Sequence, residues 1–94
     1  MEKQAVIEVR LPQLFPTHST RDVLLTRMWY VKEGDVLQPG ENLLEVEAPP
    51  GLIIIPAPPE VTVPYRVKRI FKAQGTLVRL GDLLITLEPE RGEQ

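Results

Sequence analysis

The chain has 94 residues, of which 43% are hydrophobic and 26% charged, a balance typical of one small globular domain. The formal net charge of −2 argues against a dedicated nucleic-acid binder, because phosphate contacts need clustered Lys and Arg. The absence of cysteine excludes disulfides, Cys-ligated metals and thiol chemistry. A local basic cluster is expected to be the solvent face of a strand; it consists of Arg66, Lys68, Arg69 and Lys72.

The sequence carries no signal for membrane insertion. Residues 1–10 alternate charged and apolar side chains and lack the apolar centre of a signal peptide. The longest apolar run, residues 51–59, is interrupted by prolines and is too short to span a bilayer. We therefore expect a cytoplasmic protein that does not contact membranes.

The predicted elements are short strands separated by turns. Ten prolines and six glycines punctuate the chain, and no window has the apolar spacing of a long amphipathic helix. Residues 7–11 alternate as in a half-buried strand, and residues 12–20 form a loop with two prolines. The other predicted strands, in chain order, are 23–31, 43–47, 52–55, 61–63, 66–71, 77–78 and 83–87. This succession predicts an all-β domain over residues 1–89, a sandwich or barrel, followed by a flexible tail at 90–94.

One pattern occurs twice at a constant offset. Gly34 opens the segment GDVLQPGE before the strand LLEVE, and Gly75 opens GTLVRLGD before LITLE. Both segments read Gly, five residues, Gly, an acidic residue and then a strand that ends in Glu. The repeat predicts two similar half-sheets related by a pseudo-two-fold axis, with glycines at turns that need positive φ.

These features together resemble the biotinyl/lipoyl attachment domain. Residues 29–36, WYVKEGDV, are similar to that family's W-x-V-K-E-G-D-x-V segment, and residues 9–12, VRLP, to its opening strand. Residues 43–47 and 56–58 resemble the segments that enter and leave the family's modified hairpin. The likeness covers residues 6–88 and implies a flattened barrel of two small antiparallel sheets.

The hairpin tip departs from the family pattern. In the family, a lysine at the tip is joined through its ε-amine to lipoate or biotin. Here the four tip positions hold Ala48, Pro49, Pro50 and Gly51, and Pro50 falls on the lysine position. Proline has no primary amine, and no lysine lies between Lys32 and Lys68. We therefore expect no cofactor at the ordinary attachment site.

The tip is nevertheless expected to be rigid. Proline fixes φ and glycine supplies φ > 0, so Pro50 and Gly51 fit the central positions of a type II turn. Type II is not the favoured turn of a two-residue hairpin, so a longer loop or a bulge beside the turn is expected.

No residue pattern indicates catalysis or metal binding. His18 is the only histidine, lacks a Ser, Cys or Asp partner at a recognisable spacing, and is expected to be exposed in its loop. A single histidine among scattered carboxylates is not a metal signature. Trp29 is expected to pack in the core or at a sheet edge. We therefore predict a protein that is not an enzyme.

The resemblance also implies a candidate interaction surface. In the family, the loop between the first two strands lies beside the hairpin and helps partner enzymes to recognise the domain. Carried over to this sequence, that surface consists of Phe15, His18, Pro49, Pro50 and Leu52. For Phe15 there is an alternative role, packing beneath its own loop.

Three functions stay open. The main prediction is an unmodified lipoyl-like domain for protein interaction or assembly, a monomer or weak dimer with a protein partner. The alternative is a swinging-arm carrier related to 2-oxo-acid dehydrogenase or biotin carboxyl carrier domains, modified on Lys32 or Lys72. The third, the barrel module of efflux membrane-fusion proteins, is disfavoured because the chain lacks their long helical insertion at the hairpin tip.

Overall fold

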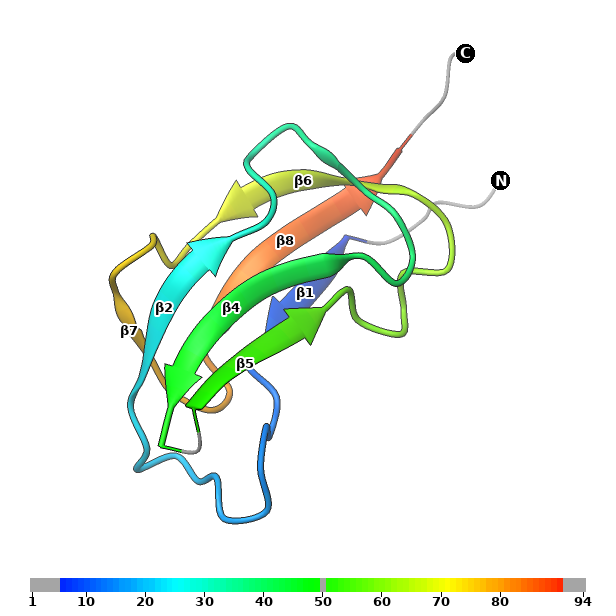
Figure 1. Ribbon diagram of the computed structural model, residues 1–94. Coiled ribbons are helices and arrows are strands. Elements are labelled where there is room, and N and C mark those ends of the chain that lie inside the picture. Colours follow the sequence, from blue (N-terminus) through cyan, green and yellow to red (C-terminus); the bar gives the residue numbers. More distant parts are fainter. Residues whose placement is uncertain (1–5, 50, 91–94) are drawn as a thin grey trace.

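The computed structural model describes residues 6–49 and 51–90, and in that part of the chain all regular structure is β (Figure 1). Eight strands form two antiparallel four-stranded sheets. None of the described residues belongs to a helix long and apolar enough to cross a membrane. The predicted all-β fold is therefore confirmed. The strands are β1 (Ile7–Arg10), β2 (Leu24–Trp29), β3 (Val36–Leu37), β4 (Asn42–Ala48), β5 (Gly51–Pro56), β6 (Tyr65–Ile70), β7 (Leu77–Val78) and β8 (Leu83–Pro89).

The two sheets have equivalent strand orders. Sheet A runs β1-β8-β6-β3, and sheet B runs β5-β4-β2-β7. Strands β6, β7 and β8 begin and end 41 residues after β2, β3 and β4, respectively. The same shift therefore converts the order of one sheet into that of the other, with β1 and β5 as equivalent edge strands (Figure 1). This is the pseudo-two-fold relation that the sequence repeat predicts.

The repeat extends to the glycine turns. The Gly34 N–H donates to the Val67 carbonyl at 2.8 Å, and the Gly75 N–H donates to the Thr26 carbonyl at 2.8 Å. The two glycines have φ of 94° and 90°. A Cβ added at either position would meet nothing within 4 Å, so glycine is needed here for its backbone conformation and not for lack of space.

The core fills the space between the two sheets. Side chains alternate between the two faces of a strand, so each strand contributes its inward positions. A register shift at Leu43, repeated at Leu84, turns an additional side chain into the core. Each fully buried Leu or Ile stabilises the fold by roughly 1.5–3 kcal/mol. The residues with no exposed surface are Leu24, Leu37, Leu43, Leu44, Val46, Val78, Leu84, Ile85 and Leu87.

The strand predicted at residues 61–63 is wrong. Val61 is buried in the core, but its N–H donates to the Pro58 carbonyl in a turn at 2.9 Å. Prolines at positions 58, 59 and 64 surround this segment and provide no N–H for a strand ladder. Val61 thus serves core packing without strand pairing, whereas Thr62 and Val63 are exposed.

Sequence analysis also missed β3. Val36 and Leu37 pair with Arg66 and Tyr65 of β6. The repeat contained the signal, because the equivalent β7 was predicted correctly 41 residues later. A two-residue strand between two glycine turns has too little periodicity to be found by itself.

The end of the described chain is attached to the domain. Glu90, which the sequence analysis assigned to the tail, accepts a hydrogen bond from the Arg66 guanidinium at 2.7 Å. The remaining predicted tail residues, 91–94, lie outside the described residues.

Substitution of the turn glycines tests the repeat. Gly34→Ala and Gly75→Ala should each lower the free energy of unfolding by about 1–2 kcal/mol, because an alanine is strained at positive φ. Urea unfolding of each variant measures this loss. Gly34→Asn and Gly75→Asn are the controls and should lose less, since Asn tolerates the left-handed region. A different response at the two glycines would contradict their structural equivalence.

Candidate functional site

The hairpin tip and the loop between β1 and β2 lie at the same end of the molecule, the lower end in Figure 1. This is the arrangement that the sequence analysis expected for a joint surface. The opposite end carries the connection from β2 to β4, as the antiparallel pairing of β2, β4 and β5 requires.

The hairpin is tighter than predicted. Ala48 pairs with Gly51, so Pro49 and Pro50 alone connect β4 to β5. The ladder continues without a register shift from this pair as far as Leu44, so there is no bulge beside the tip. Gly51 has φ of 131° and occupies a ladder position, which excludes it from the centre of the turn. The expected type II turn on residues 50–51 includes Pro50, which lies outside the described residues.

Pro50, the residue at the family's lysine position, lies outside the described residues. The chemical groups that the described part of the tip offers come from the neighbouring residues. Pro49 is exposed, Gly51 has no side chain, and Leu52 is 59% exposed. None of these residues carries a nucleophile or an ionisable group, so the described part of the tip offers an apolar contact surface and no reactive atom.

His18 is buried, with 4% of its surface exposed, and the expectation that it is exposed was wrong. Its Nδ1 accepts a hydrogen bond from the Leu14 N–H at 3.0 Å, which assigns the proton to Nε2 in the neutral imidazole. The imidazole stacks on the Phe15 ring, with centroids 4.7 Å apart and an interplanar angle of 15°. His18 therefore supports the loop from within.

The local sequence explains how His18 comes to be buried. The His18 N–H donates to the Phe15 carbonyl at 2.9 Å, which closes a turn over Phe-Pro-Thr-His with proline at its second position. Phe15 itself is half-buried against the core. The Nε2 atom has no hydrogen-bond partner among the described residues. The Phe-Pro-x-His pattern was the available signal for a structural histidine.

The structure thus divides the five residues of the predicted surface. Pro49 and Leu52 are exposed, Phe15 is half-buried and His18 lies beneath the surface. Pro50 cannot be placed among them, because it lies outside the described residues.

Neither alternative lysine lies at a hairpin tip. Lys32 is in the connection between β2 and β3, with its Nζ 3.5 Å from Asp35, and its side chain is 84% exposed. Lys72 follows β6, with its Nζ 4.0 Å from Asp82. The Lys72 carbonyl accepts a hydrogen bond from Trp29 Nε1 at 2.7 Å, which confirms that Trp29 packs at the edge of the core.

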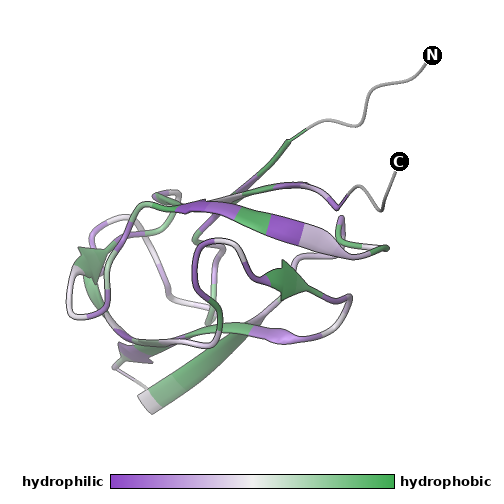
Figure 2. Ribbon diagram, turned by 90° about the horizontal axis from the view of Figure 1, so that it is seen from above, coloured by the Kyte–Doolittle hydropathy of each residue, from purple (hydrophilic) through white to green (hydrophobic). Residues whose placement is uncertain are grey.

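The outer face of sheet B carries apolar side chains that sequence analysis did not single out. Leu52, Glu47, Leu25 and Leu77 lie in one row across all four strands. Ile54, Glu45 and Met28 form the next row. In Figure 2, β5 is green along nearly its whole length, whereas β6 alternates purple and green. The continuously apolar and uncharged sequence of β5, GLIIIP, was the available signal for this face.

The equivalent rows of sheet A carry more charge, although Val36 occupies the position equivalent to Leu77. Arg66 and Arg69 occupy the positions equivalent to Leu25 and Met28, and Glu8 occupies that of Ile54. Of the predicted solvent-facing basic cluster, Lys68 and Arg69 are exposed, whereas Arg66 and Lys72 are half-buried. The two halves of the repeat therefore share a backbone and differ in the chemistry of their outer faces.

The carboxylates of the sheet B face have neighbours that balance them. Arg27 lies 3.7 Å from Glu47, and the Tyr30 hydroxyl donates to Glu45 at 3.0 Å. Desolvation by burial, together with the hydrogen bond and negative charge of Glu45, raises the pKa of the Tyr30 phenol above its ordinary value of 10.0. Glu47 is thus paired with a cation, whereas Glu45 is hydrogen-bonded to a neutral hydroxyl group.

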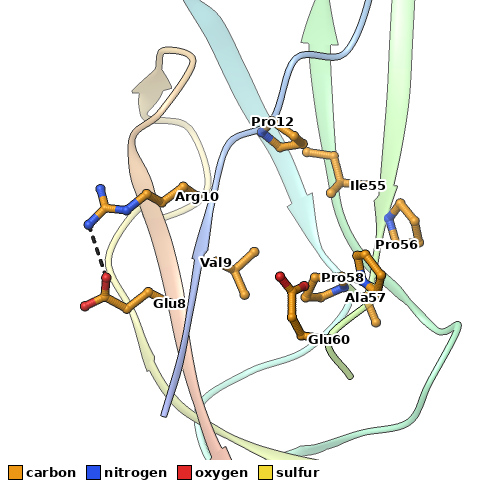
Figure 3. Close-up of a pocket in the computed structure, with 10 residues that line it drawn as sticks. Glu8, Val9, Arg10, Pro12, Ile55, Pro56, Ala57, Pro58 and Glu60 are labelled. Carbon is orange, nitrogen blue, oxygen red and sulfur yellow. Dashed lines mark hydrogen bonds and ion pairs between the residues drawn. The ribbon is translucent and has the colours of Figure 1, made fainter. Parts of the chain in front are cut away.

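A cleft of about 370 Å³ lies between the edge strands β1 and β5 (Figure 3). Val9, Pro12 and Ile55 contribute apolar walls, and the Glu8–Arg10 ion pair, 3.3 Å long, lies on the β1 side. Pro56, Ala57, Pro58, Pro59 and Glu60 complete the lining. The cleft brings together no nucleophile and base. Within residues 6–49 and 51–90, no group of three or more His, Asp or Glu side chains could hold a metal ion.

No family model matches this chain, and no curated protein matches it in sequence. The relation to the biotinyl/lipoyl attachment domain therefore stays a prediction that depends on residues 6–88 and on the hairpin. The function must be argued from the described residues themselves.

The Tyr30–Glu45 contact has a measurable pH dependence. Because the pKa of Tyr30 is raised in the folded state, its contribution to stability is complete below about pH 10 and is lost as the pH rises through the folded pKa. Ultraviolet titration of the tyrosines, with Tyr30→Phe to assign the signal, measures that pKa. Glu45→Gln should move the pKa of Tyr30 back towards 10.0. A Tyr30 that ionises below its ordinary value would contradict the contact.

Proposed function

We propose that this protein is a non-catalytic lipoyl-like domain that carries no attached cofactor and serves as an interaction or assembly module. Its proposed partner is another protein chain, and its proposed location is the cytoplasm. The observation that carries the proposal is the hairpin connection made of Pro49 and Pro50, which has no amine at the position where the family carries its lysine.

The chemistry of the attachment reaction supports this proposal. Lipoate and biotin are joined to lysine through an amide bond, which needs a primary amine. The imino nitrogen of Pro50 is part of the peptide backbone and cannot form that bond. The exposed groups around the position, Pro49 and Leu52, are apolar and suit a contact with another chain.

The alternative proposal is a carrier that is modified on another lysine. Lys32 is the better candidate, because its side chain is more exposed than that of Lys72. Lys32 lies beyond the end of β2, whereas the tip follows the far end of β4. Because β2 and β4 are antiparallel, the length of β4, roughly 20 Å, separates the two places. A ligase that recognises the hairpin would have to bind elsewhere to reach Lys32.

The intact mass of the protein isolated from its own cells tests the two proposals. We expect the mass of the bare chain, with unmodified peptides over Lys32, Lys68 and Lys72. A lipoyl-sized or biotinyl-sized addition on any of these lysines would overturn the main proposal. An addition on Lys32 or Lys72 would support the carrier alternative.

Restoring the amine tests the proposed relation to the family. When Pro50→Lys is co-expressed with a lipoate ligase and a biotin ligase, one of the two groups should be attached at residue 50. Leu52→Lys is the matched control and should stay bare, because its side chain lies on the sheet face and not at the tip. A Pro50→Lys variant that stays bare would argue against a lipoyl-like tip.

A further inference from the structure

The internal repeat allows a direct comparison of two equivalent sheet edges. Ile54 of β5 pairs with Glu45, and Glu8 of β1 pairs with Thr86, the residue 41 positions after Glu45. Ile54 and Glu8 are therefore equivalent. By the same relation Pro56, which pairs with Asn42, is equivalent to Arg10, which pairs with Leu83.

The two edges have opposite chemistry. The edge of β1 carries the ion pair of Glu8 and Arg10, the kind of charge that prevents an edge strand from pairing with another chain. The edge strand β5 has the sequence GLIIIP and contains no charged residue. Its outward side chains are Leu52, 59% exposed, and Ile54, 47% exposed. β5 thus lacks the charged residues that protect β1, and its one protective residue, Pro56, lies at its C-terminal end.

The free edge of β5 presents hydrogen-bonding groups. In a hairpin with a two-residue connection, the pair next to the connection is hydrogen-bonded, and pairs alternate from there. Ala48 and Gly51 form that first pair, so the N–H and C=O groups of Leu52 and Ile54 point away from β4. Pro56 is the next outward position and has no N–H, which ends the available edge.

Nothing in the described strands pairs with this edge. β1 and β5 are the terminal strands of different sheets, and the cleft of about 370 Å³ separates them (Figure 3). β5 is a terminal strand of its sheet, and the Leu52 and Ile54 side chains on it are exposed, which leaves room for an incoming strand at these residues.

We propose that β5 pairs antiparallel with β5 of a second copy of this chain, about a two-fold axis at Ile53. In this register Leu52 of each copy lies opposite Ile54 of the other. Each of these two pairs exchanges both of its N–H···O=C bonds, so all four bonds available at the edge are made. The Leu52 and Ile54 side chains of both copies then form one apolar cluster on the outer face of a continuous eight-stranded sheet.

The charges beside β5 allow a second copy to pair at this edge. In the proposed register, Glu47 of one copy and Glu45 of the other lie in one row, separated by Leu52 and Ile54. They are three strand spacings apart, about 14 Å. This exceeds the Debye length of about 8–10 Å at moderate salt, so their repulsion is largely screened. The ion pair of Glu47 with Arg27 reduces the repulsion further.

The size of the contact predicts a weak and closed dimer. The pairing involves about five residues of each strand, roughly 17 Å. Such a contact buries less than about 1,200 Å² in total, which places it among weak interfaces. Because the same strand is used by both copies, assembly ends at the dimer. This inference deepens the proposed function, since it names one partner of the assembly module and the surface that binds it.

Sedimentation equilibrium over increasing protein concentration tests the proposal. The wild-type mass should rise from monomer to dimer between roughly 10 µM and 1 mM. Ile54→Lys, which places a charge on the β5 edge, should stay monomeric over the whole range. Glu8→Lys at the equivalent position of β1 is the matched control and should dimerise like the wild type. Far-UV circular dichroism verifies that both variants are folded.

Two results would overturn the proposal. One is a wild-type protein that stays monomeric at about 1 mM. The other is equal behaviour of Ile54→Lys and Glu8→Lys, which would mean that β5 is not the paired strand.

Single cysteines test the register independently, since the chain contains none of its own. Ile53→Cys places two thiols opposite each other on the two-fold axis, so oxidation should produce a disulfide-linked dimer. Ile7→Cys is the equivalent position of β1 and should stay monomeric. Equal cross-linking of the two variants would contradict the register.

The outcomes separate this inference from the proposed function. A bare mass together with a monomer overturns the dimer and leaves the unmodified domain. A modified lysine together with a β5-dependent dimer overturns the proposed function and leaves the dimer.

Discussion

Each half of the chain contributes its two-residue strand to the opposite sheet, next to a glycine turn. The rest of the structure depends on this exchange of strands. Gly34 follows β2 of sheet B and is bonded to Val67 of sheet A, while Gly75 follows β6 of sheet A and is bonded to Thr26 of sheet B. Both turns need positive φ. Because each half places its two-residue strand in the opposite sheet, neither sheet is complete without both halves.

This shared frame carries two different outer surfaces. Positions held by Leu25 and Met28 in one half are held by Arg66 and Arg69 in the other. The core and the turns keep the repeat because both sheets must pack on the same interior. The outer faces are free of that constraint. The outer face of sheet B is therefore the more apolar of the two, and it includes Leu52 and Ile54 of the edge strand β5.

Most of the fold could be predicted from the sequence because its signals are local. Alternating side chains marked β1, and glycine turns marked the starts of β4 and β8. The failures came where tertiary contacts decide. Residues 61–63 have strand-like composition, but prolines remove their ladder donors, and β3 is too short to have a period. His18 was expected to be exposed because the turn over residues 15–18, which brings its ring against Phe15, was not recognised from the sequence.

By itself the sequence determined that the hairpin tip has no amine at Pro50, since a side chain's functional groups do not depend on folding. It also determined the repeat, because the positive-φ glycines and the strands around them recur at a fixed spacing. Only the tertiary structure decided which side chains share a surface. Period-two alternation assigns Leu52 and Ile54 to one face of a strand, but long-range pairing sets their neighbours. Burial of His18 likewise depends on how its loop closes over Phe15 and Leu14.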